Sequence, residues 1–375
     1  MGTVTTRGRQ LLALAHEEPG LTRAAAATRL GLSTGAAADL VTTLTAARLL
    51  DEEPVAGEGR RGRPTRRLTA HPEGPLVLAG VVTHEDWRLA AVELGGRVLA
   101  TTGGTHGSRD GTAVLRAVRA AGRRLERRFP GRVRTTGLAV PGLVHDGHLL
   151  DAPMLGWRAL DLRAVAPAGH DVVAGNDATF AAVGEARRGA AVGSALAVHL
   201  HVDAGLGGAV TVAGTVLGGA RGLAGEFGHM PFGDPAVACA CGARGCWGTA
   251  VDGSAMARAL GAPAPGDPVA YAHRVLAAAE GGDAPARAAV AEAGRALGRG
   301  IAGLVNGLDP DLVTLGGLAA DLLRRVPEEI RTACTAGLMT FRRDAPPDLA
   351  PTALGPDGPL IGAAEEAWSR LLPQL

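Results

Sequence analysis

The chain has 375 residues, of which 46% are hydrophobic and only 3% aromatic, and its formal net charge is +1 at pH 7. This length is enough to bury a large core and to form two or three structural units, and the core must be mainly aliphatic. The near-neutral charge excludes binding of polyanions by bulk charge, so any contact with nucleic acid must be local. The sequence shows no apolar secretory segment and no apolar run of about 18 residues, which indicates a cytoplasmic protein without membrane contact.

Three short helices are predicted in the first fifty residues. Residues 7–17 and 23–30 carry apolar side chains at helical spacing, and Pro19-Gly20 separates them. Ser33 follows a glycine turn and can cap a third helix that runs to about Arg48. A helix, a short glycine turn and a second capped helix are typical of a helix-turn-helix, whose last helix is placed against DNA.

A basic segment follows this motif and reads as a two-stranded wing with arginines at its tip. The arginines within eight positions are Arg60, Arg61, Arg63, Arg66 and Arg67. An extended segment that contains Arg61 and Arg63 can lie along a narrow minor groove, where the negative potential is deepest. A solvated linker would also account for such a cluster, but its place directly behind a helix-turn-helix favours DNA contact. We therefore predict a winged helix-turn-helix over residues 1–70, with the DNA-binding residues Ser33, Thr34, Arg60, Arg61 and Arg63.

The expected recognition helix offers few side chains that read bases. Its early exposed positions are predicted to be Thr34, Gly35, Ala36, Ala37 and Asp39, without Arg, Asn or Gln. Contacts of Thr and Ala with thymine methyl groups discriminate weakly between base pairs. Specificity is therefore expected to come more from the wing and from DNA shape.

Residues 222–249 hold three of the four cysteines and a histidine in close succession. The chemistry-bearing residues are, in order, His229, Cys239, Cys241 and Cys246. Three thiolates and one imidazole are the ligand set of a closed tetrahedral zinc site, which leaves no position for water and is therefore structural. Free or disulfide-bonded cysteines are the alternative, but the length of the chain and the isolated Cys334 fit a disulfide framework poorly.

Beyond residue 75, strands, glycines and helices alternate. Strands are predicted at 76–82, 89–94, 136–140, 171–174, 194–202, 207–212 and 311–315, and helices at 111–129, 178–188, from 253, 285–306, 319–338 and 362–372. Strands followed by glycines and then by helices, twice over, indicate an α/β body in two similar lobes. Glycine-rich strand ends at 204–208 and 315–317 can cradle a phosphate, although glycine is too abundant here for this pattern alone to indicate a nucleotide site.

Asn176 and Asp177 lie where a predicted strand meets a helix. An Asp at this point can accept a proton from a sugar hydroxyl while the Asn holds the sugar. Asn and Asp also fill helix N-caps routinely, and the spacing alone favours that structural role.

Several motifs together resemble the ROK family, which is named for its repressors, open reading frames and kinases. Residues 225–229 look like the family's E-x-G-H element, and residues 239–246 match its C-x-C-G-x-x-G-C element. Residues 176–178 match the segment that holds the sugar and the catalytic Asp, and residues 306–317 are similar to the segment lining the adenosine side of the cleft. The N-terminal motif ending in Gly62-Arg63-Pro64 resembles that of the repressor branch, which includes xylose repressors.

The resemblance implies an α/β, actin-like or hexokinase-type body behind the N-terminal domain, usually assembled as a homodimer or homotetramer. The body is expected over residues 75–375, with one lobe over about 75–190 plus the C-terminal helix and the other over about 191–360. By the same resemblance, the residues expected to face a sugar are Asn176, Asp177, Glu226 and His229, with His229 also binding zinc.

The phosphate-binding loops depart from the family pattern. Family kinases have Asp-x-Gly-Gly-Thr after the first strand, whereas residues 80–86 here read Gly-Val-Val-Thr-His-Glu-Asp. The second loop has Asp203-Ala204-Gly205 where Gly-Thr-Gly is frequent, and Gly248 stands where a Glu usually reaches the sugar. Phosphoryl transfer depends on positioning and charge neutralisation, so we expect no ATP binding and regard Asp177 as a vestigial base.

The sequence thus predicts a transcriptional regulator, most simply a repressor, that binds a double-stranded DNA operator through its N-terminal domain. Its non-catalytic body would sense a sugar or a related small ligand and mediate oligomerisation. The alternative is an active ATP-dependent sugar kinase that carries an extra DNA-binding domain.

Overall fold

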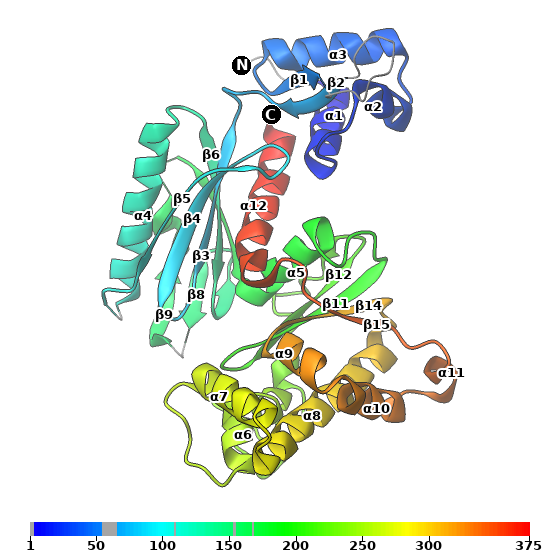
Figure 1. The fold of residues 1–375 in the computed structure, drawn as a ribbon. Coiled ribbons are helices and arrows are strands. Elements are labelled where there is room, and N and C mark those ends of the chain that lie inside the picture. Colours follow the sequence, from blue (N-terminus) through cyan, green and yellow to red (C-terminus); the bar gives the residue numbers. More distant parts are fainter. Residues whose placement is uncertain (1–3, 55–65, 109, 153–154, 167–168) are drawn as a thin grey trace. The chain divides into compact units, whose positions relative to one another are not determined.

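The structure, a computed structural model, describes residues 4–54, 66–108, 110–152, 155–166 and 169–375 (Figure 1). The chain forms two compact units, Met1–Asp177 together with Leu360–Leu375, and Ala178–Pro359. None of the described helices combines the length and the apolar character that crossing a membrane requires.

The N-terminal part of the first unit consists of three helices and a two-stranded ribbon. These elements are α1 (Thr6–Glu17), α2 (Arg23–Leu30), α3 (Thr34–Ala46), β1 (Leu50–Pro54) and β2 (Arg66–Ala70). Thr5, Thr22 and Ser33 each accept a hydrogen bond from the backbone amide three residues further on, so all three helices have capped N-termini. The predicted helices agree with the structure to within two residues, and β1 pairs with β2 in antiparallel fashion.

A five-stranded sheet forms the centre of the first unit, in the order β10-β6-β3-β4-β5. Its strands are β3 (Leu76–Val82), β4 (Asp86–Glu93), β5 (Val98–Thr105), β6 (Val133–Val140) and β10 (Asp171–Asn176). Strands β3, β4 and β5 form an antiparallel meander, whereas β6 and β10 run parallel to β3.

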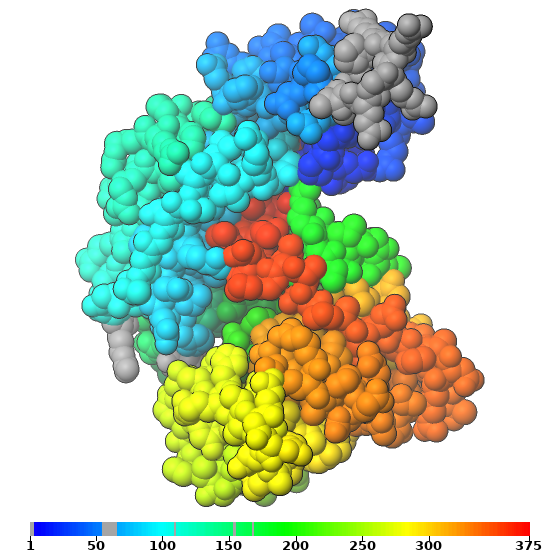
Figure 2. Space-filling model, viewed as in Figure 1, coloured from blue at the N-terminus to red at the C-terminus, as the bar shows by residue number. Residues whose placement is uncertain are grey.

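Two helices cover this sheet, α4 (Gly111–Arg128) and α12 (Gly358–Leu371). Leu138 of β6 belongs to the apolar cluster that includes Leu115 and Val118 of α4. The neighbouring Gly137 points the other way, because a Cβ there would overlap the backbone of Ala363 in α12. The two helices therefore lie on opposite faces of the sheet, with the red C-terminal helix against the cyan strands (Figures 1 and 2).

A second five-stranded sheet lies at the centre of the other unit, in the order β13-β12-β11-β14-β15. Its strands are β11 (Leu196–Val202), β12 (Leu206–Val212), β13 (Thr215–Val216), β14 (Leu312–Gly317) and β15 (Asp348–Pro351). Strands β11, β12 and β13 again form an antiparallel meander, and β14 and β15 again run parallel to its first strand. The two sheets thus share one topology, as the repeated strand, glycine and helix pattern predicted.

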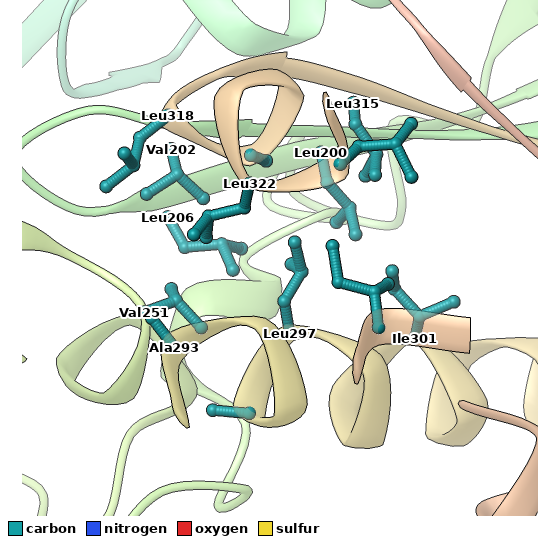
Figure 3. Close-up of a cluster of buried hydrophobic side chains, with 14 of the residues drawn as sticks. Leu200, Val202, Leu206, Val251, Ala293, Leu297, Ile301, Leu315, Leu318 and Leu322 are labelled. Carbon is teal, nitrogen blue, oxygen red and sulfur yellow. The ribbon is translucent and has the colours of Figure 1, made fainter. Parts of the chain in front are cut away.

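Helices surround the second sheet and build an aliphatic core on it. They are α5 (Asp177–Arg188), α6 (Gly253–Ala259), α7 (Pro268–Glu280), α8 (Ala284–Leu308), α9 (Leu318–Arg325), α10 (Pro327–Gly337) and α11 (Thr340–Arg343). Leu200 of β11 and Leu315 of β14 are fully buried against Leu297 and Ile301 of the long helix α8 (Figure 3). This contact attaches α8 to the centre of the sheet.

The predicted elements differ from the structure at several places. The single helix expected at 319–338 is divided into α9 and α10, because Val326 precedes Pro327 and a residue before proline is disfavoured in helical conformation. A small antiparallel sheet of β7 (Leu143–His145), β8 (Leu149–Ala152) and β9 (Trp157–Asp161) was not predicted. Its strands have three to five residues, too few to show a periodic pattern.

Substitutions of two glycines in α8 test how tightly the helix packs against the end of the cysteine-rich loop. Trp247 is fully buried and its indole Nε1 donates to the carbonyl oxygen of Ala296, 3.0 Å away. A Cβ on Gly300 would overlap this indole, so we expect Gly300→Ala to lower the free energy of unfolding by about 1–3 kcal/mol. Urea denaturation measures the change.

Gly307 in the same helix supplies the matched control. No atom lies within 4 Å of a Cβ built there, so Gly307→Ala should raise the free energy of unfolding by roughly 0.5–1 kcal/mol through the helix propensity of alanine. Equal effects of the two substitutions would contradict the close packing at Gly300.

Candidate functional site

One histidine and three cysteines converge in the loop that follows β13. The four residues are His229, Cys239, Cys241 and Cys246, whose ligand atoms lie within 4.8 Å of one another. His229 Nδ1 is 3.8 Å from Cys239 Sγ, and the sulfur atoms of Cys241 and Cys246 are 3.6 Å apart. Thiolates on one tetrahedral zinc ion lie about 3.8 Å from each other, so the spacing fits four ligands around a single metal.

Backbone hydrogen bonds shape this loop around its sulfur atoms. The amide of Cys239 donates to Ala243 O at 2.8 Å, and the amide of Gly242 donates back to Cys239 O at 3.0 Å. Gly242 and Gly245 have φ values of +94° and +72°, in the region that glycine adopts without strain. The glycines between the cysteines therefore allow the tight turns that bring the thiols together.

The protein environment acts on two of these thiols in opposite directions. Burial raises the pKa of Cys246, which is 1% exposed, to about 12. A backbone hydrogen bond from Ala243 lowers the pKa of the exposed Cys241. Without a cation the buried thiol would stay protonated, and a divalent metal would reverse this preference by binding the thiolate.

The second nitrogen of His229 faces a carboxylate. His229 Nε2 lies 3.8 Å from Glu226 Oε2, and both side chains are about half exposed. Histidines that bind metals commonly direct their other ring nitrogen toward a carboxylate, which fixes the tautomer and the ring orientation. Glu226 is thus placed to orient His229, and both side chains remain open to a solvent-borne ligand.

The other two predicted ligand residues lie at the junction of β10 and α5. The amide nitrogen of Asn176 donates to the carbonyl oxygen of Gly142 at 2.9 Å, which ties the end of β10 to the neighbouring segment. Asp177 is the first residue of α5, where a carboxylate interacts favourably with the positive end of the helix dipole. Asn176 and Asp177 belong to the first unit, whereas Glu226 and His229 belong to the second.

The turn between β3 and β4, where family kinases carry their first phosphate loop, is closed by its own side chains. Thr83 Oγ1 accepts hydrogen bonds from the amides of Glu85 and Asp86, at 3.2 and 3.1 Å. The Thr83 hydroxyl itself donates to Asp86 Oδ1 at 2.7 Å. Two amides of this turn are therefore already used within it, and a carboxylate stands beside them.

The glycine-rich end of β14 is covered by side chains from the end of β11. A Cβ on Gly316 would overlap the imidazole of His201, and one on Gly317 would lie 2.9 Å from Asp203 Oδ1. His201 Nε2 and Asp203 Oδ2 are 3.0 Å apart, so the two side chains contact each other over the glycines. The N-terminus of α9, which begins here, has no side-chain cap.

A neighbouring histidine on β11 belongs to the core and was not singled out from the sequence. His199 Nδ1 is 2.9 Å from Thr314 Oγ1, and the side chain is 2% exposed. Burial lowers the pKa of His199 to about 3, so the ring is neutral in the folded protein. In the sequence, only its position between apolar residues of a predicted buried strand indicates that this histidine lies in the core.

The predicted DNA-binding residues are only partly within the described chain. Ser33 and Thr34 are exposed at the start of α3, with the Ser33 hydroxyl capping the helix. Ala37 was predicted to be exposed, which is wrong: it is 3% exposed because it lies on the apolar face of α3 with Val41 and Leu44.

The arginines of the predicted wing also lie only partly within the described residues. Arg60, Arg61 and Arg63 lie outside the described residues. Arg66 and Arg67, on β2, form ion pairs of 3.8 and 3.1 Å with acidic residues of β1, Glu52 and Glu53. These two arginines are therefore partly neutralised within the ribbon itself.

Taken together, the fold and the cluster define an α/β protein with two sheets of one topology, a three-helix N-terminal segment and a histidine and cysteine cluster in its second unit. A model of the ROK family matches residues 85–369. The chain therefore belongs to the ROK family, and its body has the actin-like, hexokinase-type fold.

Solved structures and characterised relatives include both regulators and kinases. The crystal structure of a ROK family transcriptional regulator, a homologue of the E. coli MLC protein, superposes with a TM-score of 0.78 over 98% of this chain and 97% of its own, at 23% identity. That likeness shows the fold over nearly the whole chain.

Two relatives illustrate the functional range at the level of sequence. A glucokinase of Halalkalibacterium halodurans is 32% identical over 200 residues, which cover 48% of this chain and 60% of the glucokinase. The xylose repressor of Caldicellulosiruptor bescii is 30% identical over 203 residues, 49% of this chain and 50% of the repressor. The chain thus spans about half to three fifths of these relatives, and similarity alone does not separate a repressor from a kinase.

Proposed function

We propose that this protein is a DNA-binding transcriptional regulator, of the repressor type, whose ROK body senses a sugar or a related small ligand without phosphorylating it. The observation that carries the proposal is the capped α2–α3 pair and the ribbon β1–β2 ahead of the ROK body. The superposition of a ROK transcriptional regulator along 98% of the chain supports it. Such a regulator would act in the cytoplasm as a homodimer or homotetramer.

The N-terminal residues 1–70 would act as a winged helix-turn-helix. The exposed face of α3 presents Thr34, Gly35 and Ala36, none of which reads a base pair strongly. Further along, the hydroxyls of Thr42 and Thr43 donate to carbonyl oxygens of their own helix at 2.9 and 2.8 Å. This arrangement supports a mode in which the wing arginines and DNA shape provide most of the specificity.

The turn after β3 and the glycine-rich end of β14 support a body that does not transfer phosphate. In the turn after β3, Thr83 occupies the amides of Glu85 and Asp86, and no glycine allows a phosphate to approach the backbone. At the end of β14, His201 and Asp203 lie over the glycines that would approach a nucleotide. A carboxylate near each loop would also repel the phosphates of ATP.

Within the body, residues 75–375, we assign a structural zinc site to His229, Cys239, Cys241 and Cys246. Three sulfur ligands and an imidazole suit zinc, which would cross-link the loop and fix its shape. Glu226 and His229 lie at the border of this loop, and together with Asn176 and Asp177 they are the residues we propose for binding a sugar-type ligand.

Removal of wing arginines should lower the affinity for DNA and should also make that affinity less dependent on salt concentration. For an operator selected from random duplexes by the wild-type protein, Arg61→Ala with Arg63→Ala should reduce the slope of log K against log salt by about 2, because two groove cations are lost. Arg124→Ala, which removes an exposed charge from α4, is the control and should leave the slope unchanged. Fluorescence anisotropy at several salt concentrations measures both slopes.

A turnover assay separates the regulator from the alternative of an active kinase. We expect no sugar-dependent hydrolysis of ATP across a panel of hexoses, because the turn after β3 uses its own amides and the second phosphate loop carries the Asp203 carboxylate. Sugar-dependent turnover that disappears in an Asp177→Asn variant would establish the kinase and refute the non-catalytic body. Turnover that survives this substitution would come from a contaminant.

Metal analysis tests the zinc assignment. Plasma mass spectrometry should find about one zinc per chain in the wild-type protein and almost none after Cys241→Ser, because a tetrahedral site loses one of its four ligands. The control Cys334→Ser changes a buried cysteine outside the cluster and should retain the metal. An intact protein without bound metal would rule out the site.

A further inference from the structure

Helix α1 contains a buried histidine that contacts the far end of the chain. His16, in the last turn of α1, and Glu365, in α12, are each 2% exposed. His16 Nε2 lies 3.1 Å from Glu365 Oε2 across a sequence separation of 349 residues. A polar pair that is buried so completely must be specific in its geometry, because neither partner has water as a substitute.

The other ring nitrogen of His16 fixes the position of the proton. The amide of Gly95, in the turn between β4 and β5, lies 3.0 Å from His16 Nδ1. A backbone amide can only donate, so Nδ1 is the acceptor and the ring proton of the neutral imidazole is on Nε2, directed at the Glu365 carboxylate. One side chain of the N-terminal helices therefore bridges two separate elements of the body.

Further contacts enclose this bridge. The rings of His16 and Trp368 have centroids 5.4 Å apart, and Trp368 is fully buried. Near the chain ends, the amide of Val4 donates to the carbonyl oxygen of Leu375 at 3.2 Å. The last two turns of α12 and the C-terminal residue thus lie against the N-terminal helices, as the red and blue segments show in Figure 1.

Helix α12 spans the boundary between the two units. Its first residues, Gly358 and Pro359, belong to the second unit, and from Leu360 onward it belongs to the first. In the first unit it packs tightly on β6, where Gly137 leaves room for the backbone of Ala363. The helix that holds Glu365 is therefore continuous with the ligand-sensing body.

We propose that the Gly95–His16–Glu365 contact is the coupling that holds the N-terminal DNA-binding domain in one orientation on the ROK body. Apolar surfaces tolerate small rotations, whereas two hydrogen bonds in different directions from one ring define a single orientation. A shift of α12 relative to the β4–β5 turn breaks one of the two bonds and changes how the domain is presented to DNA. This inference rests on the proposed DNA-binding function.

Two conservative substitutions of His16 remove its two hydrogen bonds one at a time. The amide of Gln in His16→Gln reaches the position of Nε2, so this variant keeps the donor to Glu365 and loses the acceptor for Gly95. In His16→Asn the side-chain oxygen takes the position of Nδ1, so the acceptor for Gly95 is kept and the donor to Glu365 is lost. Glu365→Gln keeps an acceptor without the charge, and Ser369→Ala, at an exposed position of α12, is the control.

Hydrogen exchange and DNA affinity together provide the test. In the full-length protein, His16→Asn and His16→Gln should each accelerate amide exchange in residues 6–17, and Gly95 should lose protection only in His16→Gln. On the operator selected by the wild type, each His16 variant should bind about tenfold more weakly. The double variant His16→Asn with Glu365→Gln should lose less binding than the sum of the losses in the two single variants, because the two side chains act through one contact.

The outcomes distinguish this inference from the function on which it rests. A wild-type protein that selects no DNA sequence would overturn the DNA-binding function and the coupling with it. Selection of an operator, with His16 variants that bind and exchange like Ser369→Ala, would overturn the coupling alone. Thermal melting of every variant shows whether a weaker complex reflects unfolding, and additive losses in the double variant would also count against the coupling.

Discussion

Close approach of helices at positions where only glycine fits determines how both units are built. With 3% aromatic residues, the core relies on aliphatic side chains and on short distances between backbones. Gly137 admits α12 to the face of β6, and Gly300 admits the Trp247 indole to α8. The first contact determines where Glu365 lies on the sheet, and the second anchors the end of the loop that holds the histidine and cysteine cluster.

Local signals made much of the fold predictable. The caps at Thr22 and Ser33 marked helix starts, and the spacing of His229 and the cysteines predicted a cluster that the structure brings within ligand distance. Features that depend on tertiary packing were not predictable in this way. The burial of Ala37 is set by the packing around α3, and His16 meets Glu365 from 349 residues away, a separation over which no periodic pattern carries information.

At the positions of the two phosphate loops of family kinases, the chain keeps the sheet topology but has different side chains. Both units keep a sheet of the same strand order, so the framework that positions such loops is present. At the loops themselves, Thr83 binds its own turn and Asp203 contacts His201 above Gly316. The sequence shows that the family residues are missing, whereas the structure adds that two amides of the first turn and the glycines at the end of β14 are in contact with side chains of this chain.

The chain passes between the units at only two points, between Asp177 and Ala178 and between Pro359 and Leu360. Any change in the angle between the units has to be absorbed at these covalent crossings. The first lies at Asp177, among the residues that we propose to hold the ligand, and the second lies in α12, six residues before Glu365. In the proposed regulator, a ligand at the first crossing would bind beside one covalent link between the units, and the other link lies in the helix that contacts His16. In the regulator that we propose, this connectivity would link the body to the N-terminal domain without a change in the fold of either unit.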